Sequence, residues 1–310
     1  MLRLGPRQIV ALAYSTAAIA LAAQWVAAKI ALGAITPFEL STVRFAVASV
    51  LFAVVALATR TRLPLDRWRP VVAAAAFGFL GFNALAFLGL RLTPATDSAL
   101  IVPTTIPVAT ALIATLVREQ ITSRKLLGLL VASLGAAIVI VGGQQLGGEF
   151  STMRLLGDLL ELGSAVAWAA CLTVSALVVR TGSVLGFVTM ASLIGTALLF
   201  PLGFLEKGYG DVPSWSVGSW LAIAVLGILS TFVAFLIFFW AVSRFGPSRG
   251  ALISYLAPVA ALLIAFVVLG EQPALVQLGG AVVILAGVRL LATRPTASAV
   301  TLPRSAPSFR

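Results

Sequence analysis

The stretch ALIVPTTIPVATALIATLVREQITSRKLLGLLVASLGAAIVIVGG (residues 99–143) has a counterpart in ALISYLAPVAALLIAFVVLGEQPALVQLGGAVVILAGVRL (residues 251–290). The two stretches share short motifs in the same order and at nearly the same distance along the chain. The matches are SALI with GALI, REQ with GEQ, and Gly128 and Gly135 with Gly280 and Gly287, all 152 residues apart, and PVA with PVA at 151. Similarity at one fixed spacing indicates an internal duplication.

The composition places the chain in a membrane. Hydrophobic residues make up 60% of it, charged residues only 10%, and the mean hydropathy is +1.10. A soluble protein carries roughly 25% charged residues. Apolar runs recur that are long enough to cross a hydrocarbon core about 30 Å thick. Runs this continuous favour helices over the strands of a barrel, so we expect an all-α integral membrane protein.

Ten transmembrane helices are predicted, five in each copy of the duplication. An odd number of helices per copy inserts the two copies with opposite orientation, an arrangement typical of secondary transporters. The predicted helices cover residues 8–31, 37–58, 70–92, 95–117, 124–143, 155–179, 183–205, 216–242, 247–269 and 273–292. We therefore divide the chain into a first repeat (1–143), a linker (144–154), a second repeat (155–292) and a disordered tail (293–310).

The charges fix an expected orientation. The net charge is +11, but Lys and Arg lie almost entirely between the apolar runs rather than in a basic stripe with interleaved aromatics. This pattern argues against a nucleic-acid partner. Sixteen Lys and Arg fall on the side of the two termini and three, Arg91, Arg154 and Lys207, on the other side. Because cytoplasmic segments carry the excess of Lys and Arg, we expect both termini in the cytoplasm and the protein in the inner (plasma) membrane.

The sequence offers little material for catalysis or for binding a cofactor. It contains no histidine, and Cys171 is the only cysteine, which excludes an intramolecular disulfide. There is no Ser/His/Asp set and no cluster with metal-ligand spacing. The glycine-rich segment 142–150 lacks the Lys-Ser/Thr pair of a phosphate-binding loop. We expect no enzyme activity, no cofactor and no metal, but a small-molecule substrate.

The two stretches quoted above resemble the drug/metabolite transporter superfamily, in particular its ten-helix EamA-type exporters. QWVAAK (24–29), PFELSTVRFAVA (37–48) and GDLLELGSAVAWAACLTVSA (157–176) add to the resemblance. The chain departs from it in the first helix, where Leu21 and Ala22 replace a frequent Trp-Gly pair. The resemblance implies two five-helix repeats that export amino acids or related small metabolites by alternating access. A monomer in the bilayer is expected, with a dimer as the alternative.

Three prolines are predicted to act as hinges or gates. Pro103 and Pro107 lie in the fourth predicted helix, and Pro258 lies in the ninth. Each proline leaves the carbonyl four residues earlier without its usual donor. Breaks in corresponding helices of the two repeats indicate a binding site. The alternative is a kink that serves packing alone.

Polar and aromatic groups within spans are the candidates for a substrate cavity lined by the first, third, fourth, sixth, eighth and ninth helices. Polar side chains in a membrane are costly and therefore often functional. The candidates are Gln24, Asn83, Thr104, Thr105, Trp168, Ser254 and Tyr255. For Gln24 and Asn83 the competing role is an interhelical hydrogen bond, and for Trp168 and Tyr255 it is packing.

Charged residues near the outer side form a further group. Arg44 is expected to hold a substrate carboxylate or to pair with Glu39 or Glu161. Lys29 is expected to extend its ammonium to the membrane surface. Asp158 and Glu161 are candidates for a vestibule, or are acids favoured at a helix N-terminus.

Other functions are weighed against these features. Nucleotide-sugar or sugar-phosphate exchange needs several cationic side chains in the cavity, and only Lys29 and Arg44 are available. A drug carrier of the same superfamily is a further alternative. However, the first helix lacks the membrane glutamate with which the small multidrug exporters exchange protons for cations. An intramembrane lipid-modifying enzyme would need paired acids or histidines deep in the spans. The ion coupling of transport stays open.

Overall fold

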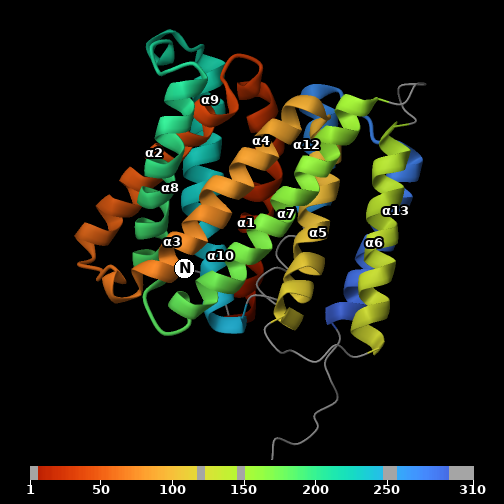
Figure 1. Cartoon of the computed structure of the whole chain (residues 1–310), viewed down its shortest axis with the longest axis horizontal. Helices are drawn as coiled ribbons and strands as arrows, with labels where there is room; N and C mark the ends of the chain where they lie inside the picture. The colour runs from red at the N-terminus through yellow and green to blue at the C-terminus, as the bar shows by residue number, and fades with distance from the viewer. Residues whose placement is uncertain (1–5, 117–122, 145–150, 247–256, 293–310) are drawn as a thin grey trace, which may run out of the picture.

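The computed structural model describes residues 6–116, 123–144, 151–246 and 257–292. In these ranges the regular structure consists of helices, drawn in Figure 1. The helices are α1 (Pro6–Leu32), α2 (Pro37–Ala58), α3 (Trp68–Ala74), α4 (Phe82–Leu92), α5 (Ala95–Leu116), α6 (Ser123–Gln144), α7 (Thr152–Val179), α8 (Val184–Glu206), α9 (Val217–Ala224), α10 (Ala234–Phe245), α12 (Ala257–Leu269) and α13 (Leu275–Ala292). Two short 3₁₀ turns are η1 (Leu65–Arg67), directly before α3, and η4 (Val212–Ser214), between α8 and α9.

Two spans contain a π-helical segment. Segment η2 (Ala75–Gly81) joins α3 to α4, and segment η5 (Val225–Val233) joins α9 to α10. The first set, together with η1, forms the span Leu65–Leu92, and the second set forms the span Val217–Arg244. The two segments begin 150 residues apart, close to the spacing of the sequence duplication.

The predicted all-helical membrane fold is confirmed. In the described part of the chain, seven helices are long and apolar enough to cross a membrane, and α6, α12 and α13 contain shorter apolar stretches. Large apolar side chains are exposed around the bundle, among them Leu57 at 79%, Leu205 at 80% and Leu275 at 85%. Such exposure suits a surface that faces lipid. The ninth predicted helix is described only from Ala257 onward, and the predicted tail lies outside the described residues.

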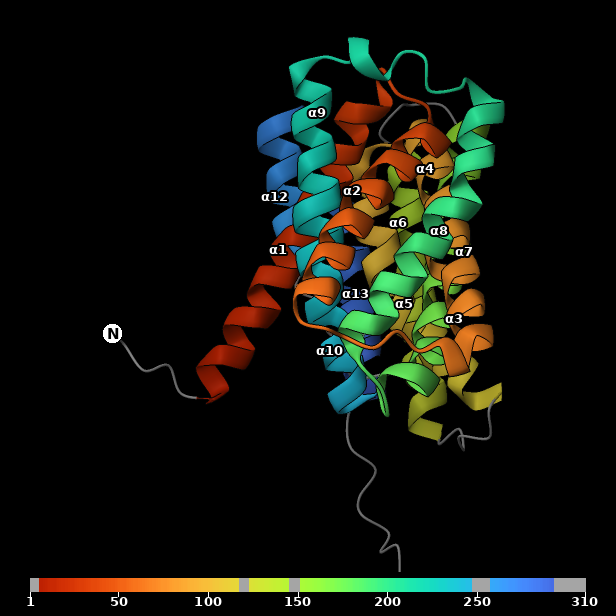
Figure 2. The ribbon, with the colours of Figure 1, turned by 90° about the vertical axis from the view of Figure 1, so that its left-hand side faces the viewer.

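The bundle has two ends, which we name after a residue at each. The Lys29 end holds the end of α1, the starts of α5 and α7, and the connection from α12 to α13. The Arg67 end holds the start of α3 and the connection from α7 to α8, where Arg67 donates to the carbonyl of Leu177 at 2.9 Å. In Figure 2 the first turns of α1 stand away from the other helices toward the Arg67 end.

Helices α6 and α13 form a tightly packed pair at one edge of the bundle (Figure 1). Glycines bring their backbones together. A Cβ on Gly135 would lie 2.8 Å from the carbonyl oxygen of Gly280, and a Cβ on Gly287 would lie 2.4 Å from the backbone nitrogen of Ala132. The hydrophobic effect does not drive two helices together inside a lipid bilayer, because lipid tails are as apolar as the side chains. Close van der Waals contact between the backbones supplies the attraction instead. We call this contact the glycine seam.

Candidate functional site

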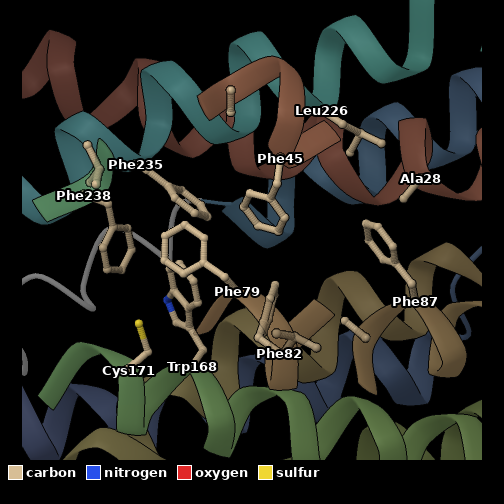
Figure 3. Packing of buried hydrophobic residues seen from close by; sticks show 14 of the residues in the cluster. Ala28, Phe45, Phe79, Phe82, Phe87, Trp168, Cys171, Leu226, Phe235 and Phe238 are labelled. Atoms are coloured by element: carbon tan, nitrogen blue, oxygen red, sulfur yellow. The ribbon is translucent and has the colours of Figure 1, made fainter. Parts of the chain in front are cut away.

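An aromatic cluster occupies the middle of the bundle (Figure 3). The ring of Trp168 on α7 lies 5.1 Å from that of Phe82 on α4, measured between centroids. On α10, Phe235 and Phe238 lie 5.1 and 5.9 Å from the same indole. Tilted and edge-on contacts at these distances are favourable for aromatic rings. The cluster therefore joins α4, α7 and α10 around one side chain.

A central cavity lies against this cluster, with a volume of about 30 Å³. It is lined by helices α1, α4, α5, α7, α10 and α12, which correspond to the six helices predicted to line a substrate cavity. Its wall includes Gln24, Phe82, Pro103, Trp168, Phe235 and Ala257. Because one water molecule needs roughly 10–15 Å³, the cavity has room for only about two or three waters. Its polar groups are the Gln24 amide and the indoles of Trp25 and Trp168, and no charged side chain of the described chain lines it.

Asn83 is fully buried but is not a lining residue of the cavity. Its Nδ2 donates to the carbonyls of Gly78 and Phe79, at 3.2 and 3.0 Å, in the π-helical segment η2. In η5, the Thr231 hydroxyl donates in the same way to the carbonyl of Leu226 at 2.7 Å. A π-helical turn displaces backbone hydrogen bonds, so these side chains supply donors within their own spans. Neither the substrate role nor the interhelical role expected for Asn83 matches these contacts.

Arg44 lies inside the bundle, fully buried. Its Nε and Nη2 donate to the Thr231 hydroxyl at 3.1 and 2.9 Å, and its guanidinium lies 5.0 and 5.5 Å from the rings of Phe45 and Phe87. Cation–π contacts of this kind stabilise a charge that is removed from water. The expected pairing with Glu39 or Glu161 is wrong, since neither ion pair forms in the described structure.

Lys29 turns into the protein instead of toward the membrane surface. Its Nζ donates to the carbonyls of Leu90 and Thr93, both at 2.6 Å. These carbonyls belong to the C-terminal end of α4, where the helix dipole favours a cation. The expectation of a surface-directed ammonium is therefore wrong, and Lys29 ties α1 to α4.

Asp97, in the first turn of α5, is the centre of a hydrogen-bond network. Arg154 on α7 donates to it through Nε at 2.7 Å and Nη2 at 3.0 Å. Gln277 on α13 donates at 2.7 Å, and the Thr93 hydroxyl at 3.0 Å. The same hydroxyl also lies 2.8 Å from Oδ1 of Asp158. This network connects α5, α7 and α13 at the Lys29 end.

Two further carboxyl groups complete the closure of this end. Glu271, in the connection from α12 to α13, accepts from the backbone N–H groups of Ala95 and Thr96 at 3.1 and 2.8 Å. It therefore caps the start of α5. Glu161 on α7 accepts from the Ser98 hydroxyl at 2.5 Å. We call these contacts, with those of Lys29 and Asp97, the Lys29-end closure.

The positions of Asp158 and Glu161 differ from expectation. Helix α7 begins at Thr152, so both residues lie beyond its first turn, and both are fully buried. They are neither exposed vestibule groups nor first-turn acids. Both belong to the inside of the Lys29-end closure.

The closure lies directly over the central cavity. Glu161 and Trp168 are seven residues apart on α7, which puts them on one face and about two turns apart. On α5, Ser98 precedes the lining residue Val102 by about one turn. On α1, Lys29 follows the lining residue Trp25 by the same spacing. Three helices therefore contribute one residue to the cavity and another to the layer that covers it.

The prolines of α5 do not interrupt it. The helix is continuous from Ala95 to Leu116 with Pro103 and Pro107 inside, both buried. The Thr104 hydroxyl donates to the carbonyls of Leu100 and Ile101 rather than to that of Ala99, which Pro103 leaves without a donor. The interruption expected in this helix is therefore absent.

The remaining predicted site residues are dispersed. Gln24, Pro103 and Trp168 line the central cavity. Thr104 and Thr105 line a second hollow of about 250 Å³, with residues of α6 and α7. Ser254 and Tyr255, and with them the proposed break in the ninth helix, lie outside the described residues, whereas Pro258 lies at the start of α12 as described.

Sequence reasoning missed several residues of this region. Phe82, Phe235 and Phe238 look like ordinary apolar span residues, and only their packing on Trp168 sets them apart. Asp97, Arg154 and Gln277 lie near predicted span ends, where polar residues are common. In the described chain no group of three or more His, Cys, Asp or Glu residues could hold a metal ion.

Comparisons with known proteins place this architecture. The model of the EamA-like transporter family matches residues 8–141 and 155–293. The uncharacterized transporter YyaM of Bacillus subtilis (strain 168) is 27% identical over 270 residues, which cover 84% of this chain and 86% of the relative. A probable terminal-alkyne amino-acid exporter of Streptantibioticus cattleyicolor is 28% identical over 257 residues, covering 82% and 84%. One solved crystal structure, 24% identical, superimposes with a TM-score of 0.67 over 92% of this chain and 98% of its own.

Proposed function

Since this chain belongs to the EamA-like transporter family, we propose that it is a secondary carrier that exports amino acids or related small metabolites by alternating access. Family membership and the apolar helices make it a multi-pass transporter of a cell membrane. The relative described as a probable terminal-alkyne amino-acid exporter, 28% identical, supports the substrate class.

The observation that carries the proposal is the central cavity beneath the Lys29-end closure. A carrier needs a site that one end of the bundle covers while the other end gives access. Here α5, α7 and α13 are bonded together over the cavity, while the first turns of α1 stand apart at the Arg67 end (Figure 2). Ligand sites measure roughly 300–1,000 Å³. To admit a solute, the cavity therefore has to widen when the closure opens.

The orientation and symmetry of the carrier belong to the same proposal. The excess of Lys and Arg on the side of the termini supports a cytoplasmic Arg67 end and an external Lys29 end. The π-helical segments η2 and η5 occupy the third span of each predicted repeat, which supports the inverted repeats over 1–143 and 155–292. The two repeats then rock against each other around the cavity.

The lining of the cavity favours a neutral or zwitterionic solute. Aromatic rings suit an apolar side chain, and the Gln24 amide offers both a donor and an acceptor. Phosphorylated sugars need cationic groups, and the described lining contains none. The described lining also contains no acidic side chain that could pair with a cationic drug.

Solute flux in proteoliposomes tests this function. Labelled amino acids, a nucleotide sugar and a cationic drug are compared for saturable uptake with the wild-type protein and with Gln24→Leu. The control is Thr173→Val, whose hydroxyl contacts the carbonyl of Ala169 on its own helix. Saturable amino-acid flux that Gln24→Leu lowers and Thr173→Val retains supports the proposal. Absence of flux for every amino acid, with folded protein, contradicts the substrate class.

A further inference from the structure

Glu161 is a fully buried carboxyl group with few hydrogen-bond donors. Its Oε1 accepts from the Ser98 hydroxyl at 2.5 Å, and its buried Oε2 has no hydrogen-bond partner. An ionised carboxylate in such a place loses the donors that water would supply, and that loss is costly in free energy. Protonation removes this cost.

Asp158, about one turn from Glu161 and also fully buried, lies 2.8 Å from the Thr93 hydroxyl through Oδ1. Three other acids of the described chain, Asp97, Glu271 and Glu39, accept from charged or backbone donors. Asp97 accepts from Arg154, Gln277 and Thr93, and Glu271 accepts from two backbone N–H groups. Glu39 on α2 accepts from the backbone and the hydroxyl of Thr36, in a capping box at a helix N-terminus. Charged and backbone donors of this kind stabilise a carboxylate. In the described structure, Glu161 accepts from a neutral hydroxyl instead.

The charged groups around Glu161 are few. Asp158 lies about one turn away on α7, and Lys29 approaches from α1. Helix α5 faces it with the hydroxyl of Ser98, and α4 faces it with Gly89, at whose position a Cβ would lie 3.2 Å from Cδ of Glu161. The ammonium of Lys29 is bonded to the carbonyls of Leu90 and Thr93, so it does not neutralise Glu161 through a direct ion pair.

The protonation state of Glu161 is therefore linked to the position of the closure. While the Lys29 end is closed, water is excluded and the neutral carboxyl is favoured. When that end opens, water solvates the group and its ionised form becomes accessible. A proton that binds more tightly in one conformation shifts the population toward that conformation by the same free energy. Proton uptake at Glu161 consequently favours closure over the empty cavity.

We propose that Glu161 is the proton-binding residue of the Lys29-end closure and couples solute export to proton entry. This inference rests on the proposed carrier function. A proton from the external side binds Oε2 after the solute has left, and the closure forms over the neutral carboxyl. The proton leaves through the cavity toward the Arg67 end, and no covalent bond other than O–H forms or breaks.

Two assays separate this role from a structural one. The first measures pH-gradient-driven flux and gradient-free exchange of a labelled mixture of the twenty amino acids in proteoliposomes. The control is Glu39→Gln, since Glu39 is a buried carboxyl outside the cavity wall. In the wild type and in this control, the pH gradient is expected to raise the flux roughly tenfold. Glu161→Gln, which mimics the neutral form, loses the stimulation but retains exchange. Glu161→Asp keeps a carboxyl and regains part of the stimulation.

The second assay needs no substrate. Infrared difference spectra of the purified protein, recorded across a pH titration, report the C=O band of a protonated carboxyl. We expect the band in the wild type and in Glu39→Gln, and its loss in Glu161→Gln. A band that persists in Glu161→Gln overturns the proposal, as does gradient stimulation in that variant. If no amino acid is transported but the band is lost in Glu161→Gln, the substrate class fails while proton binding at Glu161 stands.

Discussion

Arg154 holds Asp97 through two guanidinium nitrogens, with Nε 2.7 Å from Oδ2 and Nη2 3.0 Å from Oδ1. The Asp97 side chain is 1% exposed and that of Arg154 is 14% exposed. A two-point contact between Arg and a carboxylate fixes orientation as well as distance. The pair therefore determines how the start of α5 sits against α7 over the central cavity.

Weakening this pair is expected to open the Lys29 end. In an Asp97→Asn variant, the charge partner of Arg154 is lost and an open conformation gains population. A cysteine placed at Val102, in a Cys171→Ala background, then reacts faster with a membrane-impermeant maleimide added at the Lys29 end, which is external in the proposed orientation, by roughly tenfold. Asp66→Asn serves as the control, since it removes the exposed ion pair with Arg67 at the opposite end. Equal labelling rates in both variants would show that the pair does not hold the closure.

Neighbouring glycines on α13 are expected to respond differently to alanine. A Cβ on Gly280 would lie 2.9 Å from the carbonyl oxygen of Gly135, whereas a Cβ on Gly279 meets nothing within 4 Å. Gly280→Ala pushes α6 and α13 apart and should cost about 1–3 kcal/mol of stability. Gly279→Ala should keep or raise the midpoint temperature of thermal unfolding, because alanine favours a helix. Thermal unfolding in lipid nanodiscs compares the two, and equal midpoints would refute the importance of the glycine seam.

A second steric prediction concerns η2 and α7. A Cβ on Gly78 would lie 2.4 Å from Sγ and 2.8 Å from Cβ of Cys171. Gly78→Ala is therefore expected to destabilise the protein by about 1–3 kcal/mol. Cys171→Gly removes both clashing atoms, so the double variant should be more stable than the sum of the single effects predicts. A double-mutant cycle on unfolding midpoints measures this coupling, and strict additivity would contradict it.

Pro107→Ala tests whether α5 bends during transport. The substitution restores an N–H that can donate to the carbonyl of Pro103 and removes the ring that crowds the preceding turn. We expect a stiffer helix, with a slower maximum flux of amino acids and a nearly unchanged half-saturation concentration. Pro201→Ala, in α8 outside the cavity wall, is the control. A wild-type rate in Pro107→Ala would leave this proline with a packing role alone.

The helices could be predicted from the sequence because long apolar runs and their interruptions are local properties. The predicted fourth helix, 95–117, agrees with α5, and the predicted eighth, 216–242, agrees closely with the span from α9 to α10. Gln24 and Trp168 could also be placed in the cavity, since a polar or aromatic group in a membrane faces other helices. The π-helical segments could not be predicted, because a single displaced hydrogen bond hardly changes the apolar pattern.

The closure was beyond sequence reasoning because its contacts join residues far apart in the chain. Arg154 and Asp97 are separated by 57 residues, and Gln277 and Asp97 by 180. No local pattern selects these partners over others near the same membrane surface. Lys29 was placed correctly along its helix but assigned the wrong direction, since the carbonyls at the end of α4 offered it a better partner than water.

The glycine seam has a consequence for how such a molecule can move. Its close contacts run from Gly128 to Gly142 along α6, about 21 Å at 1.5 Å per residue. Backbone atoms that touch over such a length cannot slide past each other without separating. We therefore expect α6 and α13 to stay paired during transport, so that the other helices move relative to this pair. The remaining helices can then change their tilt without any change in which two helices meet at that edge.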